Sequence, residues 1–169
     1  ATMSYGYGIG VTPIQLAKAY AILANDGMHI PITLLKNRSY EGTRIISSDT
    51  AYDIRMMLEK VVADGTSKKA AVEGYRIGGK SGTAKKISGS GGYSTDRYLA
   101  IFAGIAPLDN PRLVVVVLID EPSGKYYYGG DVAAPVFSEV ISESLQLLSI
   151  PPNQDSLSEN LFMVEMNVE

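Results

Sequence analysis

The chain has 169 residues, which is enough for one domain with a hydrophobic core. Its 15 basic and 18 acidic side chains nearly balance, and this argues against nucleic-acid binding as the main function. Cysteine is absent, which excludes disulfides and thiolate metal sites, and the single histidine, His29, argues against a zinc hydrolase. The longest wholly apolar run, Leu113 to Ile119, is too short to cross a membrane.

The first half of the chain predicts two helices and one strand. The first helix is expected from Thr12 to about Asp26, and the strand from Ile30 to Lys36. The second helix is expected from near Ser48 to Asp64-Gly65, followed by one or two short helical turns in residues 66–73. Thr12 can cap the first helix and Gln15 can close a capping box with it. Ile54 and Leu58 belong to an apolar stripe at helical spacing in the second helix.

The second half predicts an antiparallel meander, because short turns join three strand-like runs. These runs are Arg76 to Ile87, Tyr98 to Ala106 and Leu113 to Ile119. The last run is apolar on both faces, so both faces should be covered. A final helix follows with Pro135 near its start. We expect an α+β domain in residues 1–150, with helices on an antiparallel sheet, and a mobile tail in residues 151–169.

The stretch Lys80-Ser81-Gly82-Thr83 is the strongest candidate for a functional site. In an extended strand, Ser81 and Thr83 point to the same face and offer two hydroxyls to an anionic group. Gly82 between them lets a ligand approach the backbone closely. Lys80 adds a positive charge, although simple alternation puts it on the opposite face from Ser81.

The same letters complete a phosphate-loop pattern, G-x-x-x-x-G-K-[ST], at Gly74 to Ser81. A phosphate loop needs a buried strand before it and a long helix after it. Residues 67–73 carry three charges and one β-branched residue, and Gly82 would fall in the first turn of the helix. These neighbours do not suit a phosphate loop, so a K-[ST]-G motif on a strand is the main interpretation. Magnesium-dependent nucleotide binding is the alternative interpretation of the same residues.

K-[ST]-G, S-x-x-K and S-x-N together form the signature of penicillin-interacting enzymes. The surroundings of the first motif resemble class B penicillin-binding proteins, and most closely the septal, cell-division D,D-transpeptidase of Gram-negative bacteria. The resemblance rests on four blocks in register: Gly78 to Lys86; Ser4 to Gly8 with Val11 to Ala17; Phe102 to Pro107; and Tyr128 to Gly130 with Ala134 to Phe137. It implies a serine β-lactamase-like α+β fold, incomplete in this chain.

Two parts of the signature are missing. No serine has a lysine three positions later, and the only Ser-x-Asn, Ser158-Glu159-Asn160, lies in the polar tail. The chain therefore resembles the C-terminal part of a transpeptidase domain. A companion segment or chain with Ser-x-x-Lys and Ser-x-Asn must supply the nucleophile.

The resemblance implies roles for individual residues. The backbone N–H of Thr83 would be one oxyanion-hole donor, and Lys80 would supply positive potential. The substrate-binding residues would be Ser81, Gly82, Thr83, Lys85, Tyr5, Tyr7, Tyr127, Tyr128 and Gly129. Tyr126 would also be a candidate for the aromatic wall, for which ordinary packing is the alternative.

The resemblance also implies a setting. Peptidoglycan stem peptides and β-lactam antibiotics would bind, division proteins including a glycan polymerase would be partners, and no metal or cofactor would be needed. The parent protein would face the periplasm from an inner-membrane anchor outside this chain. A D,D-carboxypeptidase or β-lactamase of the same fold, and a non-catalytic binding module, remain alternatives.

Overall fold

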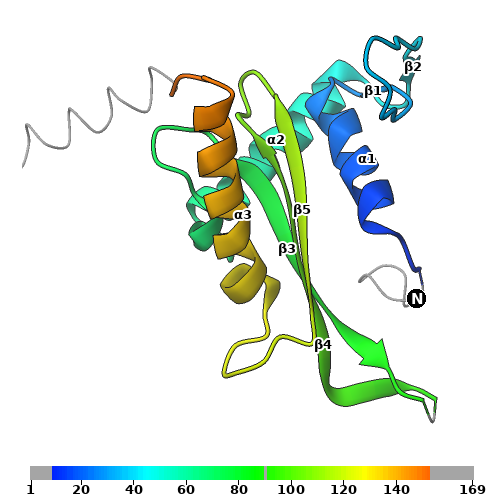
Figure 1. Cartoon of the computed structure of the whole chain (residues 1–169), viewed down its shortest axis with the longest axis vertical. Coiled ribbons are helices and arrows are strands. Elements are labelled where there is room, and N and C mark those ends of the chain that lie inside the picture. Colours follow the sequence, from blue (N-terminus) through cyan, green and yellow to red (C-terminus); the bar gives the residue numbers. More distant parts are fainter. Residues whose placement is uncertain (1–8, 90, 153–169) are drawn as a thin grey trace, which may run out of the picture.

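The computed structural model of the chain describes residues 9–89 and 91–152. Its elements, in chain order, are α1 (Pro13–Ala24), β1 (Met28–His29), β2 (Thr43–Arg44), α2 (Ser48–Ala63), the short 3₁₀-helix η2 (Lys68–Ala70), β3 (Gly78–Ile87), β4 (Tyr93–Ala106), β5 (Leu113–Asp120) and α3 (Gly129–Leu147). Figure 1 shows α3 along one face of the β3–β4–β5 sheet and α1 and α2 on the other side. The predicted α+β class is confirmed.

The three long strands form the predicted antiparallel meander in the order β3–β4–β5. Ser81 on β3 lies opposite Phe102 on β4, and Thr83 lies opposite Ala100. Within the described part of the chain, β3 is therefore an edge strand whose outer side is open to a ligand. This arrangement exposes the backbone of Lys80 to Thr83, which we call the lysine-led motif, along that edge.

The core lies between the sheet and α3. The rings of Phe102 on β4 and Phe137 on α3 meet at 4.7 Å between centroids, and both side chains are fully buried. A Cβ at Gly104 would lie 2.6 Å from the Phe137 ring, so glycine is needed where β4 passes under α3. Ile141 and Leu145 continue the buried face of α3. These contacts hold α3 against the middle of the sheet.

Local signals in the sequence set the first two helices. The Thr12 hydroxyl accepts a hydrogen bond from the Gln15 N–H, and the Gln15 side chain accepts one from the Thr12 N–H, which is the predicted capping box. Arg55 in α2 donates to the Leu23 carbonyl at 2.6 Å and to the Asp26 carboxylate at 2.8 Å. This buried guanidinium joins the end of α1 to α2.

The predicted strand from Ile30 to Lys36 is wrong. The strand in this region is β1, which ends at His29 and pairs with β2. Ile32 is 52% exposed and Leu34 is fully exposed, so these apolar side chains have no sheet to pack on in the described structure. Pro31 also lacks the N–H that a strand pairing uses. β-Propensity alone therefore misled the prediction.

The final helix begins earlier than predicted. α3 starts at Gly129, so Pro135 lies inside the helix instead of near its start. Packing against β3 determines this start, as described below. β4 also begins at Tyr93, five residues before the expected Tyr98. β5 has α1 on one side and α3 on the other, as expected, but as the second edge of the described sheet it stays partly exposed.

Some predictions concern residues outside the described ranges, including most of the expected tail, residues 153–169. Among the residues that are described, no helix is long and apolar enough to cross a membrane.

Candidate active-site cleft

The lysine-led motif lies on a strand, as the K-[ST]-G interpretation requires. Lys80 to Thr83 are in the middle of β3, and the strand continues to Ile87. The phosphate-loop interpretation is wrong, because it needs a helix directly after Ser81 and no helix follows there. Magnesium-dependent nucleotide binding at this motif is therefore not proposed.

A cavity of about 490 Å³ opens beside this part of β3. It is lined by Thr66, Lys80, Ser81, Gly82, Thr83, Tyr128, Gly130 and Asp131. We call this cavity the cleft. It brings together the edge strand β3, the loop before η2 and the first turn of α3, which are separate segments of the sequence.

The two hydroxyls of the motif point to the same side of β3. The Ser67 hydroxyl donates to Ser81 Oγ at 3.1 Å, and the Gly129 N–H donates to Thr83 Oγ1 at 3.0 Å. A Cβ at Gly82 would find only the Ile101 side chain within 4 Å, at 3.9 Å. Because side chains alternate along a strand, this open space lies on the face of β3 opposite the two hydroxyls.

Lys80 reaches the cleft although it alternates with Ser81 along the strand. Because β3 is at the edge of the described sheet, the lysine side chain can bend around the open side of the strand. Its Nζ donates to the Ser81 carbonyl oxygen at 2.7 Å. This contact brings the positive charge to the same edge as the two hydroxyls and resolves the apparent conflict with strand alternation.

The N-terminus of α3 forms the opposite wall. A Cβ at Gly129 would collide with the carbonyl oxygens of Gly82 and Ile101, and one at Gly130 would collide with that of Thr66. Two consecutive glycines therefore let the helix start directly against β3 and the preceding loop. The partial positive charge of a helix N-terminus favours an anion here.

One acidic side chain modifies the charge of this wall. Asp131 lines the cleft and forms a 2.7 Å ion pair with Lys69, which lies in η2. Both partners are partly exposed, so the pair contributes little to stability, about 0–1 kcal/mol. Its effect on the cleft is electrostatic, because it places a carboxylate near the hydroxyls and a compensating cation behind it.

Aromatic side chains continue the wall of the cleft. Tyr128 lines the cleft, and its ring packs on that of Tyr127 at 4.5 Å between centroids. Tyr127 in turn stacks on Tyr98 of β4 at 4.1 Å. The hydrogen bond between the Tyr127 and Tyr128 hydroxyls is the main cause that raises the pKa of Tyr128. Tyr126 instead lies below the Lys69 ammonium, at 5.7 Å.

The sequence-predicted site residues fall into three groups. Lys80, Ser81, Gly82, Thr83 and Tyr128 line the cleft. Gly129 and Tyr127 support it from behind, through the contacts given above, and Lys85 is exposed further along β3. Tyr5, Tyr7 and the Ser158-Glu159-Asn160 segment lie outside the described residues.

Sequence reasoning missed four residues at this site. Thr66 and Asp131 line the cleft, Ser67 contacts Ser81, and Lys69 pairs with Asp131. None of these residue types is unusual where it occurs in the sequence. An aspartate in the first turn of a helix, such as Asp131, is commonly explained by its favourable interaction with the helix dipole. Only the tertiary contact between η2 and α3 brings them together.

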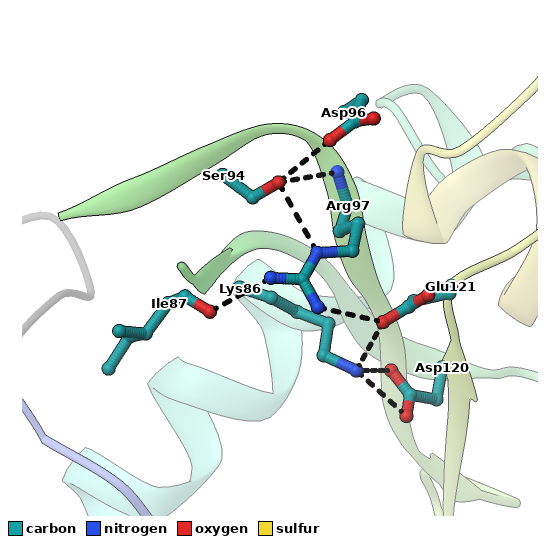
Figure 2. A network of polar contacts seen from close by, with 7 residues as sticks. All are labelled: Lys86, Ile87, Ser94, Asp96, Arg97, Asp120 and Glu121. Carbon is teal, nitrogen blue, oxygen red and sulfur yellow. Dashed lines mark hydrogen bonds and ion pairs between the residues drawn. The ribbon is translucent and has the colours of Figure 1, made fainter. Parts of the chain in front are cut away.

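A polar network fixes β3 beyond the cleft (Figure 2). Lys86 Nζ lies 2.8 Å from Asp120 and 2.7 Å from Glu121, both at the end of β5. Arg97 on β4 approaches Glu121 at 3.7 Å and donates to the Ile87 carbonyl at 3.2 Å. The carboxylates thus join the ends of three strands. Nowhere in residues 9–89 and 91–152 do three potential metal-ligating side chains gather.

Comparisons with known proteins agree with this geometry. The family model of the penicillin-binding protein transpeptidase domain matches residues 1–142. The chain is 43% identical over 156 residues to the probable peptidoglycan D,D-transpeptidase PenA of Neisseria flavescens, covering 91% of this chain and 39% of that protein. It is 40% identical over 155 residues to the peptidoglycan D,D-transpeptidase FtsI of Escherichia coli, covering 90% and 26%.

A solved structure shows the same fold. The apo transpeptidase domain of penicillin-binding protein 3 from Burkholderia pseudomallei superposes with a TM-score of 0.81 at 48% identity, covering 90% of this chain and 47% of that one. The chain thus spans less than half the length of these relatives. It belongs to the transpeptidase domain family of class B penicillin-binding proteins and corresponds to the C-terminal part of that domain.

Proposed function

We propose that this chain is part of a serine D,D-transpeptidase that cross-links peptidoglycan stem peptides at the division septum and is acylated by β-lactams. One observation carries the proposal: Lys80, Ser81 and Thr83 converge on a cleft closed by the N-terminus of α3. The names of the relatives support the reaction class, and FtsI supports the septal role.

In the proposed reaction, a serine from outside this chain attacks the carbonyl between two D-alanines of a stem peptide. The terminal D-alanine leaves with a proton on its amine, and an acyl-enzyme forms. An amine of a neighbouring stem then attacks the ester, takes the acyl group and returns the serine hydroxyl. A β-lactam follows the first step but keeps its leaving amine tethered after ring opening.

The Thr83 N–H is the proposed oxyanion donor on this chain. In an antiparallel pair, residues alternate between directing their N–H and C=O toward the partner strand and away from it. The contact of Lys80 Nζ with the Ser81 carbonyl indicates that Ser81 directs these groups to the open edge. Thr83, two residues further, does the same, so its N–H is available beside the cleft. Loss of one such donor typically raises a barrier by about 3–4 kcal/mol.

The remaining side chains would bind and orient the substrate. The Ser81 and Thr83 hydroxyls would donate to the terminal carboxylate, and Lys80 would add positive potential beside the incoming Ser-x-Asn. Tyr127 and Tyr128 would form an aromatic wall, and Gly129 would hold Thr83 in place. Tyr5, Tyr7 and Lys85 are proposed for the rim of the cleft.

A companion segment completes the proposed domain. Residues 1–150 would form its C-terminal portion and residues 151–169 a tail, while the companion carries Ser-x-x-Lys and Ser-x-Asn. By the setting of such enzymes, the complete protein would face the periplasm from the inner membrane and would work with a glycan polymerase and other division proteins. We use "the complete protein" for the chain together with this companion.

Labelling with a fluorescent penicillin tests the proposal. The complete protein should become covalently labelled, and the 169-residue chain alone should not, because it lacks the nucleophile. Absence of labelling in the complete protein would contradict the proposal. An adduct that hydrolyses within seconds would instead indicate a carboxypeptidase or β-lactamase, since these differ from transpeptidases in deacylation.

A further inference from the structure

We propose that Ser67 is a positioning residue that directs the Ser81 hydroxyl proton into the cleft, where it is donated to the carboxylate of the substrate or β-lactam. This inference rests on the proposed function. Ser67 lies on the loop between α2 and η2 and is completely buried. Its hydroxyl is 3.1 Å from that of Ser81.

The backbone of Ser67 is held on both sides. Its N–H donates to the Val61 carbonyl at 3.3 Å, and its carbonyl accepts from the Ala70 N–H at 2.9 Å. These contacts tie Ser67 to the end of α2 and to η2. Its side chain therefore points at β3 from a fixed position and does not need to be ordered when a ligand binds.

The burial of Ser67 determines the direction of the hydrogen bond. A hydroxyl has one proton, and a buried donor without a partner costs about 1–3 kcal/mol. Among the described residues, Ser81 Oγ is the hydrogen-bond partner of the Ser67 hydroxyl. If Ser81 donated, the Ser67 proton would be buried without an acceptor. Ser67 therefore donates and Ser81 accepts, which leaves the Ser81 proton for the cleft.

Thr83 is arranged in the same way by a different donor. Its Oγ1 accepts from the Gly129 N–H at 3.0 Å, so its own proton is also left over. Ser81 and Thr83 lie two residues apart on one face of β3, and both line the cleft. Two neighbouring hydroxyls that are both forced to donate match the two oxygens of one carboxylate.

Ser67 acts through Ser81 and not on the ligand. It does not line the cleft, whereas Ser81 does. Replacing Ser67 with alanine would free the Ser81 hydroxyl to rotate, and would remove one neutral hydrogen bond without changing the charge of the site. The loss should appear only with ligands that carry a free carboxylate.

The test compares two acylating probes on the complete protein: a penicillin with a free carboxylate and its methyl ester. For each we would measure the second-order rate constant of acylation and take the ratio, which does not depend on the fraction of folded protein. S67A should lower this ratio about five- to tenfold, the value of one neutral hydrogen bond. In an S81A background, S67A should have no further effect.

Two further variants control for structure. S138A removes a hydroxyl from α3 that donates to the Ala71 carbonyl at 2.7 Å, near η2 but outside the cleft, and should leave the ratio unchanged. S67C keeps a weak donor of similar size and should give a ratio between those of S67A and the unaltered protein. If S67A does not fold, S67C still tests the inference.

The outcomes separate this inference from the proposed function. Failure of the unaltered complete protein to react with the carboxylate probe would contradict the proposed function. If the unaltered protein reacts, but S67A and S67C give the same ratio of acylation rate constants as the unaltered protein, the proposed role of Ser67 is wrong. An equal loss with both probes, or an undiminished effect of S67A in the S81A background, would show a general structural role and would also overturn it.

Discussion

The Gly129 N–H, in the first turn of α3, donates a 3.0 Å hydrogen bond to the Thr83 hydroxyl oxygen in the middle of β3. This single contact fixes where the helix begins and how the hydroxyl is oriented. It also brings the positive end of the α3 dipole to the cleft, where it favours a negative ligand. A glycine is required because a side chain would collide with the Gly82 and Ile101 carbonyls.

G129A should therefore separate α3 from β3. We expect a loss of stability of about 1–3 kcal/mol from overpacking. The fluorescent penicillin should label the complete protein at least tenfold more slowly, as the Thr83 contact is lost. The measurements are thermal unfolding and the rate of labelling. G89A is the matched control, since a Cβ at Gly89 has no atom within 4 Å and should change neither quantity. Normal labelling of G129A would show that this contact is dispensable.

T83V removes the hydroxyl but keeps the backbone N–H. The pre-acylation affinity for a carboxylate-bearing penicillin should fall about five- to tenfold, as for one lost hydrogen bond, while the acylation step itself changes less. T83S keeps the hydroxyl and should stay near the unaltered protein. Stopped-flow acylation at several penicillin concentrations separates the two constants. A collapse of the chemical step alone would argue that Thr83 does not bind the carboxylate.

D131N should make the cleft more attractive to anions. The Asp131 carboxylate lines the cleft, and its removal also frees the positive charge of Lys69. We expect acylation by an anionic penicillin to rise about two- to threefold at low ionic strength, by the size of a screened like-charge interaction. The increase should disappear at high salt.

E139Q removes an acidic charge from an exposed position further along the same helix and serves as the control for D131N. It should have no effect at any ionic strength. A salt-independent gain in D131N would point to a change of shape instead of charge.

Lys86 should stabilise the strand ends in a pH-dependent way. The hydrogen bonds that the Lys86 ammonium donates to the Asp120 and Glu121 carboxylates raise the pKa of Lys86 above the ordinary 10.5. A group whose pKa is raised by folding contributes its full stabilisation below the unfolded value, and loses it as the pH rises through the folded value. The difference in melting temperature between the complete protein and its K86M variant should thus be constant around neutral pH and shrink above pH 10.5.

K36M changes the same charge on the segment between β1 and β2, away from this network. It should show no such loss at high pH. A K86M difference that persists unchanged in alkali would mean that the ion pairs do not act on stability.

Much of the fold follows from signals that are local in sequence. The Thr12–Gln15 capping box and the apolar stripe around Ile54 and Leu58 correctly predicted two helices. Short turns between strand-like runs correctly predicted the meander. The Lys80 to Thr83 motif was placed on a strand, and the cleft forms on it.

The errors arise where tertiary contacts decide. The segment that contains Ile32 and Leu34 has the apolar pattern of a strand, but it pairs with no other strand in the described structure. α3 starts at Gly129 because the helix packs on β3, and Pro135, the local signal, lies six residues too late. Ser67 and Asp131 reach the cleft through the packing of η2 on α3, which no spacing rule along the chain encodes.

Mapping the penicillin adduct tests the central claim most directly. The complete protein would be acylated, digested with trypsin and analysed by mass spectrometry to locate the modified residue. The account predicts a serine outside these 169 residues, followed three positions later by lysine. An adduct on a residue of this chain would contradict the view that β3 binds the substrate while the attacking alcohol comes from elsewhere.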